Sequence, residues 1–493
     1  MKKFLSLVLA LVMTMSLVTI SAGAAEYKDL TDKDEIQYEE AVAVLNRIGI
    51  ITGYTDGSFQ PKKELTRGAA AKIIVSLMIG SEAASNLVAA SAPYTDVPVN
   101  HTFAGVISFC KNSGYINGYQ DGSFKPSGTL SGYAFSKMLL GALGYKGEHE
   151  GGFTGAGWTM NVARIGNECG LFDRLSFKGN ESVNREQACQ LALNTLKGTL
   201  VEYTGGMNIV NGTQSVVVNP ERNYKVSNQE FASHINNKKA SGNSNYDKDN
   251  WYTVEFGEEH FVDLRMKQER STEDDFGRPS NEWSYKKVTI GTYALEPDFR
   301  YTELVAHNDK SSTDASKVRA LKLNGYEVDG STQVWLNGYE SNIDLGKVAN
   351  IANYTDNGTV VEVYVSETNA DLITDVVVIQ SALVEVKRIG SDYVTLGKYD
   401  TDGADDNQAK EGFNRNAFDL VSDGGLAASK SFNDVQVEDR GYGVLSGLKA
   451  GDKVVVVPVS EDGSNARFDV WEAYVPETVT GALTRVDTYG SSS

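Results

Sequence analysis

Two arginines stand at predicted helix starts, each directly after a side chain that can cap the helix. The pairs are Thr66-Arg67 and Asn184-Arg185. The cap oxygen accepts a backbone N–H of the first turn, and Asn184 with Gln187 has the spacing of a capping box. An arginine beside the free N–H groups of a positive helix end can hold a carboxylate through two parallel hydrogen bonds. Solvated first-turn arginines with no specific role are the alternative, and on spacing alone they are the commoner case.

The helices that carry these arginines belong to a repeated helix–loop–helix pattern. Segments 53–61 and 118–126 share Gly-Tyr-x-Asp-Gly-Ser-Phe-x-Pro at an offset of 65 residues. Before each segment, apolar residues three and four apart predict a helix that stops at Gly49 or Gly114, a residue type suited to a left-handed stop. A second apolar helix follows each segment. One such unit cannot bury its apolar face alone, so the copies must pack together.

A third, degraded copy covers residues 146–198. Its first helix precedes Gly170, its second opens after Asn184, and the Asp-Gly turn is absent. In the second copy Ser131 is the predicted cap, but Gly132 stands where the other two copies have arginine. We therefore expect the second copy to bind weakly or to serve only in completing the bundle.

The order of these motifs resembles the S-layer homology domain. The residues that carry the resemblance are Tyr27-Lys-Asp29, Gly49-Ile50-Ile51, Gly53 to Pro61 and Leu65-Thr66-Arg67. The resemblance implies three tandem repeats, at 26–80, 94–145 and 146–198, in an all-α pseudo-threefold bundle. It also implies non-covalent anchoring to the cell wall, by grooves that bind a pyruvylated secondary cell-wall polysaccharide.

The resemblance places polysaccharide binding at the positions that match the family's motif. These are Arg67, Arg185, Thr66, Asn184, Asp29 and Asp96. A ketal-linked pyruvate presents the carboxylate that Arg67 and Arg185 suit. Asp29 and Asp96 match the aspartate that opens each repeat of the family. An ordinary loop or cap role for these two aspartates is an equal alternative.

The first 25 residues are typical of a secretory signal peptide. Lys2 and Lys3 precede an apolar run from Phe4 to Ile20, and small residues follow. The run is short for a membrane span, so we expect an exported protein on the cell wall or cell surface, with no transmembrane segment in the mature chain. Removing these residues takes two lysines and changes the formal net charge from −19 to −21. So acidic a chain is unsuited to bind nucleic acid.

From about residue 199 the pattern changes to apolar alternation with turn residues, which is typical of strands. We predict β-rich segments at 199–305, 306–380 and 381–493, the last of which stops just after an apparent strand. The candidate strands are 215–218, 251–256, 261–266, 360–365, 376–379, 383–386 and 454–459. The predicted fold class is therefore multidomain, with the all-α repeat bundle followed by all-β modules built as small sandwiches or barrels.

Motifs for catalysis or cofactors are missing from this β-rich stretch. The five histidines are scattered, and neither a nucleophile elbow nor a phosphate-binding loop occurs. Asp400 to Asp406, with Glu411 downstream, suggests calcium, although Gly403 holds the fourth place of the loop and not the sixth. A solvated acidic turn is the alternative, so we expect no cofactor, with calcium as the one candidate. Three cysteines are too few for a disulfide framework; Cys169 and Cys189 either pair or remain buried thiols.

These observations predict a non-enzymatic surface protein that displays β-modules from a wall anchor. Its expected partner is secondary cell-wall polysaccharide, and self-association into a surface layer is a second candidate partnership. The alternative is an anchored extracellular enzyme such as a polysaccharide hydrolase, whose acidic pair cannot be picked out from sequence. An outer-membrane porin is disfavoured, because the amphipathic strands of about ten residues that a membrane barrel needs are missing.

Overall fold

The computed structural model describes residues 27–211, 214–218, 220–227, 235, 251–270, 276–301, 331–341, 359–365, 372–391, 393–398, 417–422, 425–431, 435–439, 445–459 and 468–475. The chain divides into two compact units. The first comprises residues 1–269 and 281–293, and the second comprises 270–280 and 294–493. The predicted signal peptide and the candidate calcium loop lie outside the described residues.

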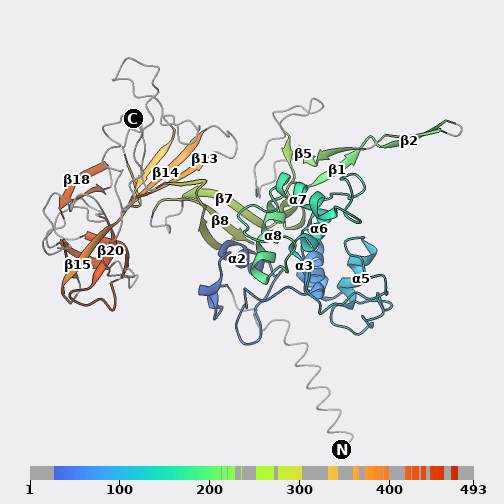
Figure 1. Cartoon of the computed structure of the whole chain (residues 1–493), viewed down its shortest axis with the longest axis horizontal. Helices are drawn as coiled ribbons and strands as arrows, with labels where there is room; N and C mark the ends of the chain where they lie inside the picture. Colours follow the sequence, from blue (N-terminus) through green and yellow to red (C-terminus); the bar gives the residue numbers. More distant parts are fainter. Residues whose placement is uncertain are drawn as a thin grey trace, which may run out of the picture. The chain divides into compact units, whose positions relative to one another are not determined.

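Three pairs of helices that follow one another along the chain, one pair from each repeat, form the helical part of the first unit (Figure 1). They are α2 (Glu39–Arg47) with α3 (Arg67–Ile79), α5 (Ala104–Asn112) with α6 (Gly132–Ala142), and α7 (Trp158–Glu168) with α8 (Arg185–Lys197). Shorter elements are η1 (Tyr27–Asp29), η2 (Lys33–Glu35) and α4 (Ser81–Ser85). Gly49, Gly114 and Gly170 follow the first helix of each pair with φ of 77°, 75° and 71°, which confirms the predicted left-handed stops.

The second helix of each repeat begins against the loop of another repeat. The antiparallel bridges that join them are Thr66 with Thr129, Ser131 with Ser182, and Asn184 with Glu64. The first repeat thus contacts the second, the second contacts the third, and the third returns to the first. This closed cycle of contacts is the physical reason for the tandem copies.

The buried core of the first unit continues past residue 198. Ile235, Phe256 and Trp283 are fully buried and belong to the same apolar cluster as the helix pairs. Trp283 Nε1 donates a hydrogen bond to Glu40 Oε1 of α2 at 2.7 Å, and Asn281 Nδ2 donates to the same oxygen at 2.9 Å. The helical repeats therefore share their core with the chain that follows.

The strands of the first unit form a ribbon and a small sheet. The ribbon contains β1 (Val201–Thr204), β2 (Met207–Asn211), β3 (Gln214–Val218) and β4 (Glu221–Tyr224), while β5 (Val226–Ser227) pairs with β6 (Tyr252–Thr253). A three-stranded sheet contains β7 (Leu264–Arg270), β8 (Pro279–Tyr285) and β9 (Val288–Ala294).

A short helix, α9 (Phe256–His260), corrects the prediction of all-β structure after residue 198. Glu255 and Glu258 form a capping box that starts this helix. Of the predicted strand 251–256 only Tyr252–Thr253, which form β6, are confirmed, and of the predicted strand 261–266 only the second half, which begins β7, is confirmed.

The second unit is built from small sheets. One has the order β10 (Phe299–Tyr301), β13 (Thr359–Val365), β14 (Ile373–Gln380), β11 (Gln333–Leu336) and β12 (Tyr339–Glu340). Another has the order β15 (Ala382–Ile389), β16 (Val394–Lys398), β19 (Val435–Asp439), β21 (Phe468–Tyr474) and β20 (Lys453–Val459), and closes on itself because β20 also pairs with β15. A third pairs β17 (Ala417–Ser422) with β18 (Gly425–Ser431).

Helices thus gather in the N-terminal part of the chain and sheets in the rest, as the sequence predicts. The predicted strands 215–218, 360–365, 376–379, 383–386 and 454–459 are confirmed. Within the described residues, none of the helices has the length and apolar character that crossing a membrane requires.

Candidate functional site

The three predicted caps hold the starts of α3, α6 and α8. Thr66 Oγ1 accepts from Ala69 N at 3.3 Å, Ser131 Oγ accepts from Ala134 N at 3.3 Å, and Asn184 Oδ1 accepts from Gln187 N at 2.9 Å. Gln187 Oε1 in turn accepts from Asn184 N at 3.1 Å, which completes the predicted capping box. All three caps are confirmed.

The expectation of free N–H groups beside the arginines is wrong. Arg67 N donates to Gly128 O at 2.8 Å and Gly68 N donates to Pro126 O at 2.9 Å. In the third repeat, Arg185 N donates to Lys63 O at 2.9 Å and Glu186 N to Pro61 O at 3.2 Å. Loop carbonyls from another repeat thus take up the donors of the first turn, and any ligand must use the side chains.

We call Arg67, Tyr119, Phe124 and Lys125 the Arg67 cluster. Arg67 Nε donates to Phe124 O at 2.8 Å, and Arg67 Nη2 donates to Asn117 O at 3.2 Å. The guanidinium carbon lies 4.5 Å from the centre of the Phe124 ring and 5.0 Å from that of Tyr119. Carbonyls and rings from the second repeat therefore fix an arginine of the first.

The Arg185 cluster, comprising Arg185, Tyr54, Phe59 and Lys63, repeats this geometry between the third repeat and the first. Arg185 Nε donates to Phe59 O and Arg185 Nη2 to Thr52 O, both at 2.9 Å. The guanidinium lies 4.8 Å from the ring centres of both Tyr54 and Phe59. Two arginines in different repeats are thus held in the same way.

A lysine adds a second cation to each cluster. Lys125 Nζ lies 4.4 Å from the ring centre of Tyr119, and Lys63 Nζ lies 4.4 Å from that of Tyr54. Both tyrosines are exposed, and each has an arginine and a lysine near its ring. Sequence reasoning missed these lysines because they occupy different positions of the repeat, one just before the loop proline and one two residues after it.

Neither Arg67 nor Arg185 has an acidic partner among the residues that the structure describes. Across the described part of the chain, no carboxylate lies within 4.0 Å of the Arg67 or Arg185 guanidinium. Burial, together with the charge of Arg67, lowers the pKa of Lys137. Each cluster therefore presents a fixed, half-buried positive charge in a strongly acidic protein, which suits it to an anionic ligand.

The second repeat has an aromatic cluster in place of the arginine. A Cβ at Gly132 would lie 2.1 Å from Phe177 Cε2, so the Phe177 ring occupies the space that a side chain here would need. Tyr133, Phe172 and Phe177 pack together with ring centres 5.4 to 6.3 Å apart. Among the described residues, no lysine or arginine stacks on the rings of this glycine cluster (Gly132, Tyr133, Phe172 and Phe177), and weak binding by the second repeat stays a prediction.

Asp96 supports the loop that carries the Arg67 cluster. Its two carboxylate oxygens accept from Phe124 N and Lys125 N, both at 2.7 Å. Desolvation acts to raise the pKa of Asp96, but these two N–H groups outweigh it and lower the pKa overall. In the first repeat Asp32 makes the same contacts, with Phe59 N and Gln60 N at 2.7 Å. Asp29 is exposed at the end of η1, so matching it to Asp96 by position is wrong.

The cysteines form no disulfide, and the described acidic residues form no metal site. Cys110, Cys169 and Cys189 are free, and burial raises their thiol pKa to about 12, 11 and 12. Groups of three or more His, Cys, Asp or Glu suited to a metal do not occur in the described ranges. Calcium at Asp400 to Asp406 stays a prediction.

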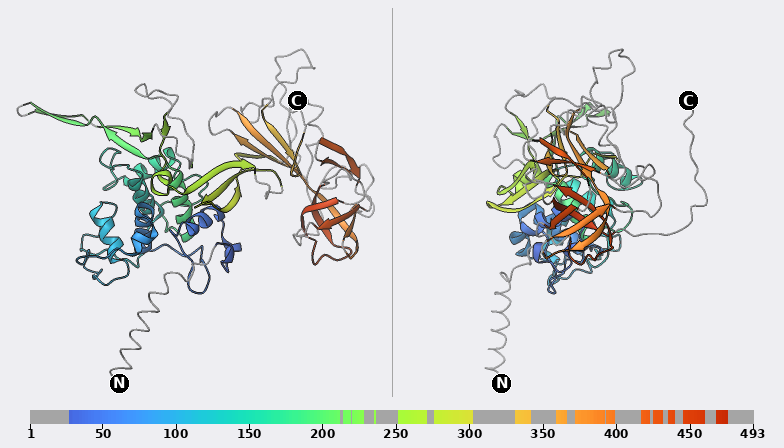
Figure 2. Two further views of the ribbon diagram at one scale, coloured as in Figure 1. Left: turned by 180° about the vertical axis from the view of Figure 1, so that it is seen from behind. Right: turned by 90° about the vertical axis from the view of Figure 1, so that its left-hand side faces the viewer.

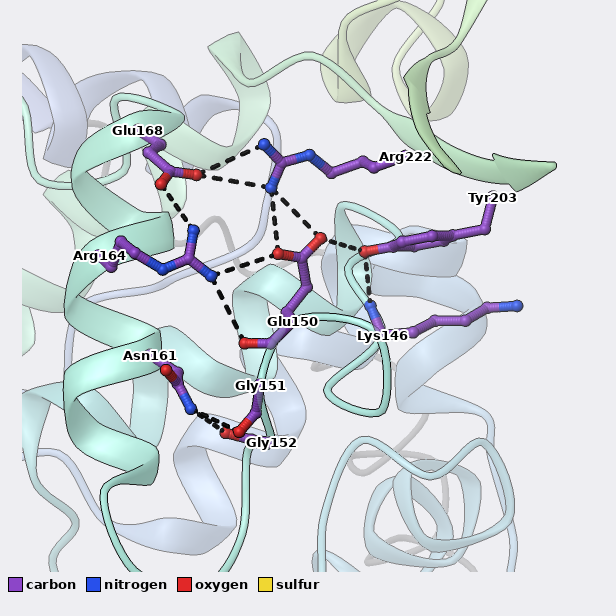
Figure 3. A network of polar contacts seen from close by, with 9 residues as sticks. All are labelled: Lys146, Glu150, Gly151, Gly152, Asn161, Arg164, Glu168, Tyr203 and Arg222. Carbon is purple, nitrogen blue, oxygen red and sulfur yellow. Dashed lines mark hydrogen bonds and ion pairs between the residues drawn. The ribbon is translucent and has the colours of Figure 1, made fainter. Parts of the chain in front are cut away.

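A separate charged cluster joins the third repeat to the β1–β4 ribbon (Figure 3). In this Glu150 network, the nearly buried Glu150 accepts from Tyr203 Oη at 2.7 Å, from Arg222 Nη1 at 3.2 Å and from Arg164 Nη2 at 3.4 Å. Glu168 pairs with Arg164 at 2.6 Å and with Arg222 at 3.4 Å. Two carboxylates therefore balance two guanidinium groups, and the network is complete without a ligand.

Comparison with known proteins locates the repeats in a family. The model of the S-layer homology domain matches residues 26–71 and 93–132. The chain is similar to a surface layer protein of Brevibacillus choshinensis, with 30% identity over 168 residues, which is 33% of this chain and 15% of the relative. It is also similar to the middle cell wall protein of Brevibacillus brevis, with 29% identity over 169 residues, 33% of this chain and 16% of the relative.

A shorter match joins the chain to cell surface glycoprotein 1 of Acetivibrio thermocellus, with 36% identity over 90 residues, 18% of this chain and 4% of the relative. The matched segments thus span about a sixth, or less, of these relatives. The first two repeats are S-layer homology sequence, and the family match together with these relatives indicates a cell-surface location. The family model does not extend over the third repeat.

Proposed function

We propose that this chain is anchored non-covalently to the cell wall by three repeats within residues 26–198, which bind a pyruvylated secondary cell-wall polysaccharide. The observation that carries the proposal is the pair of arginines, Arg67 and Arg185, that are fixed by carbonyls and rings and lack an acidic partner among the described residues. A guanidinium binds a carboxylate with two parallel hydrogen bonds, and a pyruvyl ketal supplies that carboxylate. The family match to the first two repeats supports this assignment.

The other predicted site residues have supporting roles in this proposal. Thr66 and Asn184 position the two arginines by capping their helices, and Asp96 positions the loop of the Arg67 cluster. Asp32, in place of Asp29, does the same for the Arg185 cluster. The lysines beside the exposed tyrosines would contact the polymer together with the arginines.

The test measures binding of residues 26–493 to purified cell-wall sacculi. We expect Arg67→Ala and Arg185→Ala each to weaken binding by about tenfold or more, because a charge-assisted hydrogen bond contributes about 1.5–3 kcal/mol. Arg265→Ala is the matched control, since within the described ranges this arginine of β7 hydrogen-bonds only the nearby carbonyls of Val262 and Leu264. Unchanged binding of a folded double variant would refute the site.

Removal of pyruvyl groups from the sacculi by mild acid tests the identity of the ligand independently of the binding site. The native chain should then bind treated sacculi as weakly as the double arginine variant binds untreated ones. Full binding to treated sacculi, together with loss in the variant, would keep the arginine site and replace pyruvate with another anion.

We further propose that the sheets of the second unit, within residues 294–493, are displayed modules built as small sandwiches or barrels, and that residues 199–493 have no catalytic activity. The relatives are named for surface layers and cell walls, which supports display. The test incubates residues 26–493 with peptidoglycan, wall glycans and plant polysaccharides and measures released reducing ends. Release that disappears on neutralising one Asp or Glu would establish a hydrolase instead.

A further inference from the structure

The main-chain carbonyl of Asn117 holds one side of the Arg67 guanidinium. Asn117 O accepts from Arg67 Nη2 at 3.2 Å, just as Thr52 O of the first repeat accepts from Arg185 Nη2 at 2.9 Å. Asn117 is exposed, and it lies in the loop between α5 and α6 of the second repeat, outside any helix or strand (Figure 2, light blue). A change in the main chain at Asn117 therefore reaches Arg67 directly.

Asn117 is followed by a glycine that the fold requires. A Cβ at Gly118 would lie 2.3 Å from Tyr94 Cε1 and 2.8 Å from Ser123 O, which is closer than a side chain can come. The Gly118 N–H donates to the Tyr94 hydroxyl and takes no part in a helix or strand. Because the glycine has to stay, the residue before it decides whether this loop contains an Asn-Gly pair.

An exposed asparagine before a glycine loses ammonia in water without a catalyst. The Gly118 nitrogen attacks Asn117 Cγ, the side-chain NH₂ leaves as ammonia, and a cyclic succinimide forms. Water then opens the ring at either carbonyl, so that one amide and one water become a carboxylate and an ammonium ion. Glycine favours the ring closure because it has no side chain to restrict the main chain, and asparagine is for this reason a heat-labile residue.

Isoaspartate is the product that changes the Arg67 cluster. In isoaspartate the main chain runs through the former Asn117 Cγ, and the former carbonyl carbon of Asn117 carries a free carboxylate. The oxygen that accepts from Arg67 Nη2 then belongs to an anion in place of a neutral amide. Since a charge-assisted hydrogen bond is roughly twice as strong as a neutral one, this carboxylate competes with any external anion for Arg67.

We propose that Asn117 is a deamidation site and that its isoaspartate product pairs with Arg67, so that the Arg67 cluster loses its anion site as the protein ages. The effect on wall binding rests on the proposed function, whereas the modification and the new ion pair do not. The Arg185 cluster has Thr52 at the corresponding place, and threonine carries no amide to lose. The two arginine clusters therefore age differently.

Another Asn-Gly pair, Asn337-Gly338, provides a control within the chain. Asn337 is buried, its Nδ2 donates to Gln380 O at 3.3 Å, and its Oδ1 accepts from Gln380 N at 2.7 Å. Both ends of this side-chain amide are held, so the amide is not free to turn toward the next main-chain nitrogen. Asn337 should therefore keep its amide under conditions in which Asn117 loses it.

The test incubates residues 26–493 at mildly alkaline pH and follows each asparagine by peptide mapping with mass spectrometry. We expect isoaspartate at Asn117 before any change at Asn337. Sacculus binding should fall by about tenfold or more once Asn117 is converted, as far as it falls with Arg67→Ala. Asn117→Gln is the matched control, because its longer side chain has to close a larger and less favourable ring. This variant should keep its binding through the same incubation.

Thermal denaturation detects the new ion pair without the wall. Conversion of Asn117 should lower the melting temperature less in the native chain than in Arg67→Ala, since only the native chain has a guanidinium to pair with the carboxylate. Equal losses in the two chains would refute the pair.

Two further results would overturn the proposal. One is an Asn117 that stays intact for as long as Asn337 does. The other is a converted chain that binds sacculi as the fresh chain does, although Arg67→Ala weakens binding. If fresh Arg67→Ala binds as the native chain does, the proposed function fails at this cluster, and peptide mapping and melting still decide the modification.

Discussion

The Arg67 and Arg185 clusters differ from the Glu150 network in how their arginines are compensated. In the network, Arg164 and Arg222 share the carboxylates of Glu150 and Glu168. In the two clusters, the only described partners of the guanidinium groups are neutral carbonyls and aromatic rings. A charge that is balanced inside the protein stabilises the fold, whereas a fixed charge left without a counterion can bind one from outside.

The second unit also contains arginines that pair with a carboxylate. Glu362 is buried and pairs with Arg278 at 2.6 Å and with Arg300 at 3.2 Å. Compensated arginines therefore occur in both units, whereas Arg67 and Arg185, which lack a carboxylate partner among the described residues, are also fixed by aromatic rings. This contrast predicts that removing a carboxylate from a compensated cluster should cost more stability than any change at the Arg67 or Arg185 cluster.

Loss of Glu150 should have the largest effect on stability. Glu150→Ala leaves Arg164 and Arg222 with Glu168 as their shared carboxylate, and breaking a buried pair costs up to about 3–5 kcal/mol. The measurement is thermal denaturation of residues 26–493, followed by circular dichroism of the helices. Glu148→Ala is the control, because that side chain is 73% exposed. Equal melting of the two variants would show that the network does not hold the fold.

A pair of buried carboxylates predicts that stability depends on pH. Glu255 and Glu258 are buried, and no hydrogen bond reaches Glu255 Oε2 from the described residues. Burial, reinforced by the charge of Glu258, raises the pKa of Glu255 to about 9. The folded state therefore keeps a proton that the unfolded state releases near pH 4.5, so stability falls as pH rises from about 4.5 to about 9.

Stability should consequently fall as pH rises from about 6 to about 8, by up to about 3 kcal/mol. Glu255→Gln carries no titrating proton and should flatten this dependence. The measurement is the denaturation midpoint of both proteins across that range. A native chain and a variant with the same pH slope would assign the loss to another group.

Local features of the repeats were predictable from the sequence. The caps at Thr66, Ser131 and Asn184 each act within three residues, and Gly49, Gly114 and Gly170 act at single positions. Such signals depend on short-range geometry, which a sequence records directly.

Contacts between distant segments were not predictable. Loop carbonyls about 60 residues away, or more than 120 in the third repeat, take up the helix N–H groups, and no local pattern reveals them. Trp283 joins α2 through a hydrogen bond to Glu40 that spans 243 residues. The motif predicts Asp29 as the groove aspartate, but Asp32 is the residue close enough to accept the loop N–H groups.

Placing a side chain at Gly132, in the glycine cluster, should have an intermediate effect on stability. Alanine favours a helix over glycine by about 0.5–1 kcal/mol, but a Cβ at Gly132 would overlap the Phe177 ring. Overpacking typically costs about 1–3 kcal/mol, so Gly132→Ala should destabilise the chain while sacculus binding is unchanged. A double-mutant cycle with Phe177→Leu should recover part of the loss. Additive effects of the two changes would rule out the overlap as the cause.

Substitution of the cap residue Thr66 should have the smallest effect on stability. It also tests whether this residue acts through the fold or through direct contact with the ligand. Thr66→Val keeps the shape of the side chain but leaves Ala69 N without its acceptor, which costs about 1 kcal/mol of stability. Thr66→Ser keeps the hydroxyl and should melt close to the native chain. If Thr66 acts only through the helix, sacculus binding by the folded valine variant stays within about twofold of native. A tenfold loss with Thr66→Val, absent in Thr66→Ser, would mean that the hydroxyl touches the polysaccharide. Thr66 would then belong to the binding site as well as to the structure that supports it.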